Sequence, residues 1–470
     1  MSSNFFVSMA PADNIGRFPN RDEGDFGRVS LINLFPSNVK ENLLFSMSFN
    51  SDIHYDTMTG KLDPFGTDTV LPEYQKKLPK RMFADCGAYQ FRDSPEPILP
   101  NGSKSNAENA WSEYKKRHLE KGYPWEEILL CAPDHIICRV KSYTTEENAM
   151  IANMTNDQKI LFEQNNPPKE RDLTTKEFEQ RVEFNKKQAT AFIEAAKSDK
   201  RVTPVGVIHG HCDFDKDAEQ RKKRLIELLD DGYEYVALGG MVPYSGNKKK
   251  ALKIIAGIDD LDNPIIAKDS ILGICKKKEV KLHVFGLTSP DWYRWLYRLG
   301  VDSFDGSKLA TEGAVNGIYW ILNDGNGSRR DIPKRPEKVT DLYRKVNIKN
   351  LKSTDWKWEI NDNGILSPIT PNEYKGVTLK CSCPACTYLK SARCPSKRCT
   401  IRKKFPNLRH TCEPLMRGSN EHNMGRAAHN AHVYGVLIEK IKQFNKEAND
   451  ALIEGENEWL KHWKSVEVET

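Results

Sequence analysis

Three aspartates follow short apolar runs and could carry out acid–base or nucleophilic chemistry. They are Asp85 in FADCGAYQ, Asp134 in APDH and Asp305 in SFDGS. A lone aspartate after a strand is usually a helix N-cap or a turn residue. Three of them on one edge of a sheet could converge. One carboxylate could then act as a nucleophile while another stays protonated or accepts a hydrogen bond.

Two histidines and two glycines follow other apolar runs. His209 and His211 in GVIHGHCDFD have an H-x-H spacing that can bind a metal, because alternate strand residues point the same way. We favour instead a histidine that hydrogen-bonds a ligand or fills the mouth of the site. Gly239 and Gly240 in ALGGM would let backbone N–H groups approach a planar ligand closely, although Gly-Gly is also ordinary turn chemistry.

Cysteines are concentrated near the C-terminus in a pattern typical of a zinc site. Six of the eleven fall within 32 residues: Cys381, Cys383, Cys386, Cys394, Cys399 and Cys412. The C-x-C-x2-C run at 381–386 needs only one more ligand for a closed tetrahedral zinc site. Four histidines are candidates for it, namely His410, His422, His429 and His432. We favour His429, which begins an amphipathic stretch; the three remaining cysteines could compete or form a second site.

The same region is strongly basic. Residues 381–410 contain eight Lys/Arg and no Asp or Glu, in a chain whose net charge is +6. Such a run is often a solvated face or a tail, but the interleaved cysteines favour an ordered basic surface that contacts nucleic acid. The residues expected to do so are Lys397, Arg398, Arg402, Lys403 and Lys404.

Short apolar runs alternate with amphipathic, helix-like stretches over most of the chain, which predicts a parallel α/β fold. Seven strands are expected, at 43–49, 81–86, 128–133, 202–210, 235–240, 281–287 and 301–306. Seven strands at this length favour a (β/α)8 barrel over a doubly wound sheet. The chemistry of such a barrel lies at the C-terminal ends of its strands, where the aspartates fall.

Four regions are expected along the chain. They are an irregular N-terminal segment (1–40), the barrel with a helical insertion near 140–200 (41–375), a zinc-binding subdomain with the basic insertion and a helix (376–445), and a polar, peripheral tail (446–470). No apolar run reaches the roughly 18 residues of a transmembrane helix, and the N-terminus lacks a secretory signal pattern. We therefore expect a cytoplasmic protein with no membrane contact.

The ordered set of motifs resembles the tRNA-guanine transglycosylase superfamily over roughly residues 80 to 440. The family pattern D-S-G-G-[FY]-Q resembles DCGAYQ at 85–90, and an acid after a later strand matches Asp134. The patterns V-Q-G-G, V-G-G-L, M-G-V-G and G-[IV]-D-x-F-D resemble the segments at 208–211, 238–241, 285–288 and 300–305. The C-x-C-x2-C run and the His-Asn pair at 429–430 complete the set in order.

The resemblance implies a (β/α)8 barrel with structural Zn2+ that exchanges guanine in a polynucleotide for a 7-deazaguanine through a covalent enzyme–sugar intermediate. It implies that Asp305 is the nucleophile, and that Asp85 is the general acid and base. The expected metal ligands are Cys381, Cys383, Cys386 and His429. The residues expected to bind the base are Tyr89 and Phe285 by stacking, Asp134 at the guanine edge, Gly240 and Met241 through backbone groups, and Cys86, Gln90, His209 and Gly239 in the pocket wall.

Departures from the family pattern point to its DNA-directed branch. Cys86, Ala88 and His209 replace the usual serine, glycine and glutamine, and SKLATEGAVNG stands where the tRNA enzymes have P-T-R-x-A-R. The segment ALGGMVP is similar to the G-G-L-V-P style of enzymes that insert 7-deazaguanines into DNA in phage and bacterial genomic islands. We therefore expect DNA and a free 7-deazaguanine base, preQ0 first, as partners.

Three alternatives stay open at this stage. A tRNA-directed transglycosylase would share all the catalytic residues and differ only in its polymer. A metal-dependent barrel hydrolase would use His209, His211 and Asp305. A non-catalytic nucleic-acid-binding subunit would not need Asp305. A homodimer or a partner protein is compatible with each of them.

Overall fold

The computed structural model of the 470-residue chain describes sixteen segments. They are residues 4–8, 35–47, 79–99, 101–120, 124–137, 139–211, 214–306, 312–313, 316–323, 336–347, 357–360, 366–369, 383, 386, 420–451 and 458–469. All structural statements below concern these residues.

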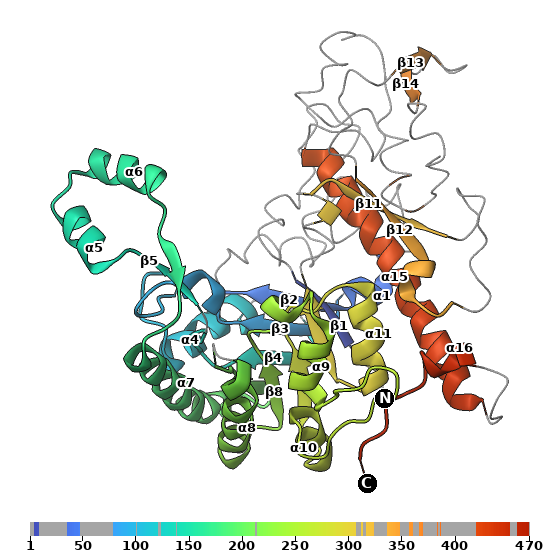
Figure 1. Cartoon of the computed structure of the whole chain (residues 1–470), viewed down its shortest axis with the longest axis horizontal. Coiled ribbons are helices and arrows are strands. Elements are labelled where there is room, and N and C mark those ends of the chain that lie inside the picture. The colour runs from blue at the N-terminus through green and yellow to red at the C-terminus, as the bar shows by residue number, and fades with distance from the viewer. Residues whose placement is uncertain are drawn as a thin grey trace.

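Eight parallel strands form a closed barrel, so the predicted (β/α)8 architecture is confirmed (Figure 1). In chain order they are β1 (Asn4–Ser8), β2 (Asn42–Ser46), β3 (Arg81–Asp85), β4 (Glu127–Cys131), β7 (Val202–Ile208), β8 (Tyr235–Leu238), β9 (Lys281–Val284) and β10 (Ser303–Gly306). Each strand pairs with the next along the chain, and β1 closes the ring by pairing with both β2 and β10.

Strand β1 corrects the expectation of an irregular segment over 1–40, which is wrong for Asn4–Ser8. Phe6 lies opposite Asp305 in the pairing of β1 with β10. The Phe6 ring is buried in the barrel interior, and the Phe5 ring is buried outside it, against Tyr434 at a centroid distance of 4.8 Å. The run NFFVS is apolar, but it lies in a stretch with scattered Pro, Asn and Gly, and this composition favoured a loop.

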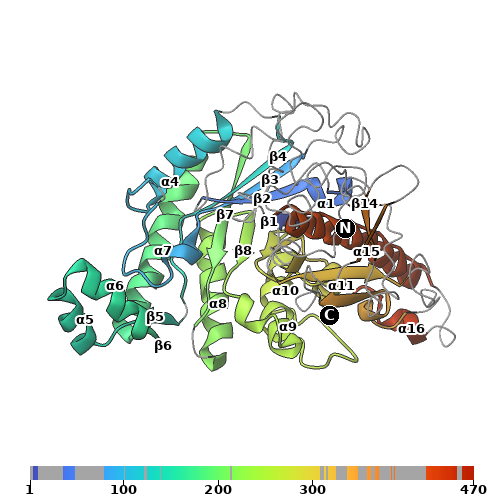
Figure 2. The same cartoon turned by 90° about the horizontal axis from the view of Figure 1, so that it is seen from above.

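Helices follow the strands and cover the outside of the barrel (Figures 1 and 2). They are α1 (Ser37–Lys40), α4 (Ala107–Tyr114), α7 (Thr175–Ala196), α8 (Phe214–Asp230), α9 (Lys248–Ala256), α10 (Ile271–Lys277) and α11 (Pro290–Leu299). Helix α11 shows how they are delimited: Ser289 caps its first turn, Pro290 begins it, and Gly300 ends it at φ 70°. Short helical turns η4 (Ala88–Phe91), η5 (Lys115–Leu119), η6 (Val242–Tyr244) and η8 (Val339–Asp341) complete the set.

The insertion predicted near 140–200 is shorter than expected. An arm of β5 (Val140–Ser142), α5 (Thr145–Ala152), α6 (Asn156–Asn165) and β6 (Lys169–Arg171) projects from the barrel (Figure 1). Helix α7, in contrast, is a barrel helix, because Ala189, Phe192 and Ile193 are buried against the core. The composition of a charged helix is similar whether or not one of its faces is buried. Composition alone therefore did not distinguish the barrel helix α7 from the projecting arm.

Helix α15 (Asn420–Asp450) packs beside β1 and α11, where the barrel ring closes (Figures 1 and 2). An antiparallel pair of strands, β11 (Ile318–Leu322) and β12 (Tyr343–Asn347), lies against it, and β13 (Lys357–Ile360) pairs antiparallel with β14 (Leu366–Ile369). Asn430 fixes β11: its amide oxygen accepts from Trp320 N–H at 2.9 Å and its amide N–H donates to the Ile318 carbonyl at 2.9 Å. The Asn430 side chain thus makes hydrogen bonds to the backbone of β11 that a neighbouring strand could otherwise make.

The C-terminal segment after α16 (Glu458–Lys461) is integral to the fold, so the expectation of a peripheral tail is wrong for this stretch. Trp463 is 0% exposed and donates its indole N–H to the Pro336 carbonyl at 2.6 Å. Arg298 of α11 donates to the Lys464 carbonyl at 2.7 Å, and Val468 bridges to Ile266. Most residues of this segment are polar, so its composition did not predict that a few of them are buried against the barrel. Among the described helices none is long and apolar enough to cross a membrane.

The position of β1 predicts a large effect of Phe6→Ala. Removing a ring that is 1% exposed should lower the free energy of unfolding by about 3–5 kcal/mol in denaturant titrations. Ile160→Ala on the projecting arm, where the side chain is 55% exposed, is the control and should change it by less than about 0.5 kcal/mol. Equal effects of the two substitutions would contradict the placement of β1 in the barrel.

Candidate active site and metal centre

Polar side chains occupy the last inward positions of several barrel strands. Every second residue of a strand faces the interior. The deeper interior positions are mostly apolar: Phe6, Leu44, Phe83, Leu129, Cys131, Val205, Val207, Tyr235 and Ala237. One inward step further toward the C-terminal ends, the alternation reaches Ser46, Asp85, His209, Phe285 and Asp305. The mouth at which (β/α)8 barrels carry their chemistry is therefore polar and acidic.

Two hydrogen-bond donors contact the Asp85 carboxyl group, and its pKa is nevertheless raised toward neutral pH. Its Oδ1 accepts from Ser46 Oγ at 2.8 Å and from the Gly87 N–H at 2.6 Å. Burial raises the pKa of Asp85 to about 7, the two hydrogen bonds oppose this, and the nearby charges of Asp305 and Asp134 add to it. A carboxyl group with this pKa can donate or accept a proton near neutral pH.

Asp134 joins two residues that the sequence marked as departures from the family pattern. Its Oδ1 accepts from Cys86 Sγ at 2.8 Å, and its Oδ2 forms a very short contact with His209 Nε2. All three side chains are buried. Burial and the nearby carboxylates raise the pKa of Cys86 well above its usual value, so the thiol stays protonated and donates. Asp134 is thus held in place by a thiol and an imidazole.

His209 lies over Gly239, and this explains why a glycine stands there. A Cβ at Gly239 would come within 2.6 Å of the His209 ring. The Nδ1 atom of His209 is buried and forms no hydrogen bond with any described residue. It is therefore a polar atom with capacity for a ligand.

An ion pair behind His209 fixes the loops after β7 and β8. Arg221 pairs with Asp217 at 2.7 Å and donates to the Gly239 carbonyl at 2.8 Å, while Asp217 also accepts from the His211 N–H at 2.8 Å. A Cβ at Gly210 would lie 1.6 Å from Asp217 Oδ1, so only glycine fits there. These buried charges were not noted from the sequence, where they lie within an ordinary charged helix.

Asp305 lies on β10, across the mouth from Asp134, and is 8% exposed. Its Oδ1 accepts from the Gly286 N–H at 2.8 Å. His283 Nε2 lies 3.5 Å from the same oxygen. The Gly286 N–H and the His283 ring therefore both face this carboxyl oxygen.

The other expected base-binding residues differ in their placement. Phe285 follows β9 and packs edge-on against Phe83 at 5.5 Å, at the top of the interior. Gly240 has φ +68° beyond β8, and the Met241 side chain is fully buried beneath the loop. The Gln90 side chain is exposed. Tyr89 lies in η4, and its side chain is outside the described residues.

The structure does not bring His209 and His211 together as metal ligands. His209 contacts Asp134, whereas the His211 ring lies 4.5 Å from the Phe178 ring on α7. Within the described parts of the chain, the only group of three or more metal-ligating side chains is elsewhere, at Cys383, Cys386 and His429.

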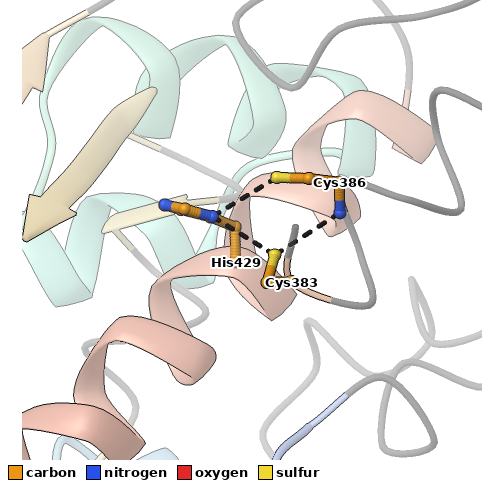
Figure 3. Close-up of side chains that lie close together, drawn as sticks. All are labelled: Cys383, Cys386 and His429. Atoms are coloured by element: carbon orange, nitrogen blue, oxygen red, sulfur yellow. Dashed lines mark hydrogen bonds between the residues drawn. The ribbon is translucent and has the colours of Figure 1, made fainter. Parts of the chain in front are cut away.

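Cys383, Cys386 and His429 form a buried group that could hold a metal ion such as zinc (Figure 3). His429 Nδ1 lies 3.4 Å from each of the two sulfurs. Ligand bonds of about 2.3 Å to sulfur and about 2.0–2.1 Å to nitrogen at a tetrahedral angle would separate S and N by roughly 3.6 Å. The observed spacing therefore fits a tetrahedral zinc ion, as the C-x-C-x2-C spacing predicted.

The surroundings of His429 fix which of its nitrogens can bind the metal. His429 Nε2 lies 2.7 Å from the Trp320 carbonyl oxygen, to which it can only donate a hydrogen bond. The neutral ring then presents its lone pair at Nδ1, toward the two cysteines. Tyr319 stacks on the ring at a centroid distance of 3.9 Å, so β11 positions the ligand.

Several expected ligands and contacts lie outside the described residues. They are the ligand Cys381, the cysteines Cys394, Cys399 and Cys412, the candidate His410, and the basic residues Lys397, Arg398, Arg402, Lys403 and Lys404. His432 is described but is not part of the metal-ligating group.

No protein-family model matches this chain, and no curated protein matches it.

Protonation of Asp85 should be visible in stability. Its folded pKa is near 7, above the 3.8 of an exposed carboxyl, so the stability it contributes is present at low pH and is lost as pH rises toward 7. Asp85→Asn can keep both hydrogen bonds without the charge. Between pH 5 and 8 its free energy of unfolding should therefore rise relative to the wild type by on the order of 2 kcal/mol, measured in denaturant at each pH. A difference that does not change with pH would contradict the raised pKa.

The metal-ligating group predicts that zinc binding depends on Cys383, Cys386 and His429. His429→Ala and Cys383→Ser should each bring the zinc content, measured by inductively coupled plasma mass spectrometry, close to zero after dialysis against a chelator. Cys275→Ser is the matched control: this thiol is buried but belongs to α10, so its removal should leave the zinc in place. Zinc retained by His429→Ala would exclude the proposed ligand.

Proposed function

We propose that this chain is a guanine transglycosylase that replaces guanine in DNA with a 7-deazaguanine base, most simply preQ0. The proposal is supported by the ordered motifs similar to the tRNA-guanine transglycosylase superfamily, by the (β/α)8 barrel and by the metal-ligating group that follows it. The observation that carries it is a pair of carboxyl groups at one barrel mouth in different environments. Asp85 has a pKa near 7, and Asp305 faces an N–H donor.

In the first half-reaction Asp305 is the nucleophile. One carboxylate oxygen attacks C1′ of the nucleotide as the bond from C1′ to the guanine nitrogen breaks and its electron pair passes to the base. Protonated Asp85 gives its proton to the leaving guanine. The enzyme–sugar ester conserves the energy of the glycosidic bond, as in retaining glycosidases.

In the second half-reaction Asp85 acts in reverse. Its carboxylate takes the proton from the nitrogen of the incoming base, which then attacks C1′ as the bond to Asp305 breaks and the electron pair returns to the carboxylate. Two inversions preserve the stereochemistry of the sugar. A group whose pKa is near the working pH serves both directions, which fits the raised pKa of Asp85.

The base would be recognised by the side chains around Asp134. A guanine edge donates from its ring N–H and amino groups, and Asp134 offers two acceptor oxygens that Cys86 and His209 now occupy. Phe285 supplies an aromatic face at the mouth. A base in a duplex would have to be flipped out to reach the pocket, so single-stranded or distorted DNA is expected to react fastest.

Zinc would be structural in this account. His429 lies on the same helix as Tyr434, whose ring packs on Phe5 of β1. Metal binding therefore stabilises the helix that covers the barrel where its ring closes, and supplies no group to the reaction. The basic run at 381–410 supports a polyanionic partner, because Lys and Arg bind phosphates without reading sequence.

The direct test is base exchange with labelled preQ0. Purified protein is incubated with double-stranded DNA, single-stranded DNA or tRNA, and each polymer is digested to nucleosides for mass spectrometry. Label is expected in a deoxynucleoside, and Asp305→Asn should reduce it by at least about 10³-fold. Label only in tRNA would contradict the choice of polymer.

Asp302→Asn is the matched control for that substitution. Asp302 lies just before the same strand, at the opposite end of the barrel, where it accepts from the Leu282 N–H at 2.9 Å. Its loss should affect stability more than exchange. Equal loss of exchange in both variants would mean that the effect of Asp305→Asn reports on folding rather than on catalysis.

A further inference from the structure

A buried histidine below the mouth has no role in the reaction as described so far. His283 is 0% exposed and lies on β9, two residues before Phe285. Its ring packs against Phe83 at 4.2 Å and Phe285 at 4.5 Å, inside the barrel. The other inward residues at this depth are mostly apolar, so a buried imidazole is unusual at this position.

His283 is connected to two hydroxyl groups in series. The Tyr235 hydroxyl lies 2.6 Å from Ser303 Oγ, and Ser303 Oγ lies 2.7 Å from His283 Nδ1. All three side chains are buried. At the other side of the ring, Nε2 lies 3.5 Å from Asp305 Oδ1 and forms no hydrogen bond with any described residue.

The direction of these hydrogen bonds follows from what each group can donate. Tyr235 has no other hydrogen-bond partner among the described residues, so its buried hydroxyl proton goes to Ser303 Oγ. The Ser303 proton is then directed to His283 Nδ1. An imidazole that accepts at Nδ1 carries its proton on Nε2, and Asp305 Oδ1 lies 3.5 Å from that nitrogen.

The charge state of the ring agrees with this arrangement. Burial lowers the pKa of His283, and the opposing effect of Asp305 does not cancel it. Burial also raises the pKa of Tyr235, so the phenol keeps its proton. The series therefore consists of neutral donors that end at one carboxylate.

We propose that His283, oriented by Tyr235 and Ser303, positions the Asp305 carboxylate and donates a hydrogen bond to it from Nε2. This inference rests on the proposed function, since it assigns the residue that prepares its nucleophile. Oδ1, which faces Gly286 N–H and His283, is the held oxygen, and Oδ2 is left to attack C1′. The gap of 3.5 Å is expected to shorten when substrate closes the site.

The same donor would act in both half-reactions. In the ester intermediate Oδ1 is the carbonyl oxygen and still accepts from Nε2. When the incoming base attacks C1′, the bond to Oδ2 breaks and the carboxylate that leaves regains its full charge. A hydrogen bond that strengthens as this charge develops lowers the barrier to that step.

Substitution of His283 separates this role from simple packing. His283→Phe keeps the ring and removes the donor, and His283→Gln restores an N–H donor. With a single-stranded oligonucleotide at saturation, the rate of adduct formation should fall about 10–100-fold in His283→Phe and recover in part in His283→Gln. The oligonucleotide concentration that gives half the maximal rate should stay unchanged.

His118→Phe is the matched control. His118 is also buried, but it lies in η5 outside the barrel wall, with its ring 5.6 Å from that of Phe45. This variant should form the adduct at the wild-type rate. A wild-type rate in His283→Phe, or no recovery in His283→Gln, would overturn the proposal.

A measurement without substrate keeps the proposal testable if base exchange fails. In protein labelled with 15N-histidine, the signal that disappears in His283→Phe identifies this ring, and its shifts report which nitrogen carries the proton. A proton on Nε2, whose signal moves in Asp305→Asn, is expected. A proton on Nδ1 would overturn the proposal. If the wild-type protein forms no adduct with the oligonucleotide, the proposed function is overturned. The nitrogen shifts would still show whether His283 Nε2 donates a hydrogen bond to Asp305.

Discussion

Confinement of three aspartates at one barrel mouth is the constraint on which the site depends, and burial there is the main cause of the raised pKa of Asp85. Asp85, Asp134 and Asp305 are brought together because parallel strands all end at the same rim. Each acid is accommodated differently: Asp85 by holding a proton near pH 7, Asp134 by contacts with Cys86 and His209, and Asp305 by the Gly286 N–H. Three chemically identical side chains thus lie in three different environments, which is what the proposed roles of acid, recognition group and nucleophile require.

The C-terminal part of the chain stabilises the same mouth from outside. Strands β1 and β10 pair directly, and Phe6 of β1 lies opposite Asp305. Helix α15 covers the outer face of β1 through Tyr434 and Phe5. Its N-terminal half carries Asn430, which holds β11, and His429, which contacts β11 and could hold the metal together with Cys383 and Cys386. A metal ion held at this group would therefore also support the proposed site, because it would stabilise the helix packed on β1, the strand that pairs with the strand of Asp305.

Much of this arrangement could be predicted from the sequence, for identifiable reasons. Seven strands were found because each is a short apolar run that ends in a turn residue, and Cys383, Cys386 and His429 were found because metal ligands have characteristic spacing. Strand β1 was missed because its apolar run lies in a stretch with scattered Pro, Asn and Gly, and the anchor Trp463 was missed because one tryptophan in a polar tail carries no periodicity. His283 and Ser303 were missed because a polar residue inside an apolar strand acquires meaning only from its cross-strand neighbour, and Ser303 is the register partner of His283.

The measurement that tests the central claim most directly is to locate the covalent bond. Wild-type protein is mixed with a guanine-containing single-stranded oligonucleotide without an incoming base, quenched and digested with protease and nuclease, and the modified peptide is sequenced by mass spectrometry. The account predicts a deoxyribose ester on the peptide that contains Asp305, and its loss on addition of preQ0. An ester on Asp85 or Asp134, or base exchange without any protein-linked sugar, would contradict it.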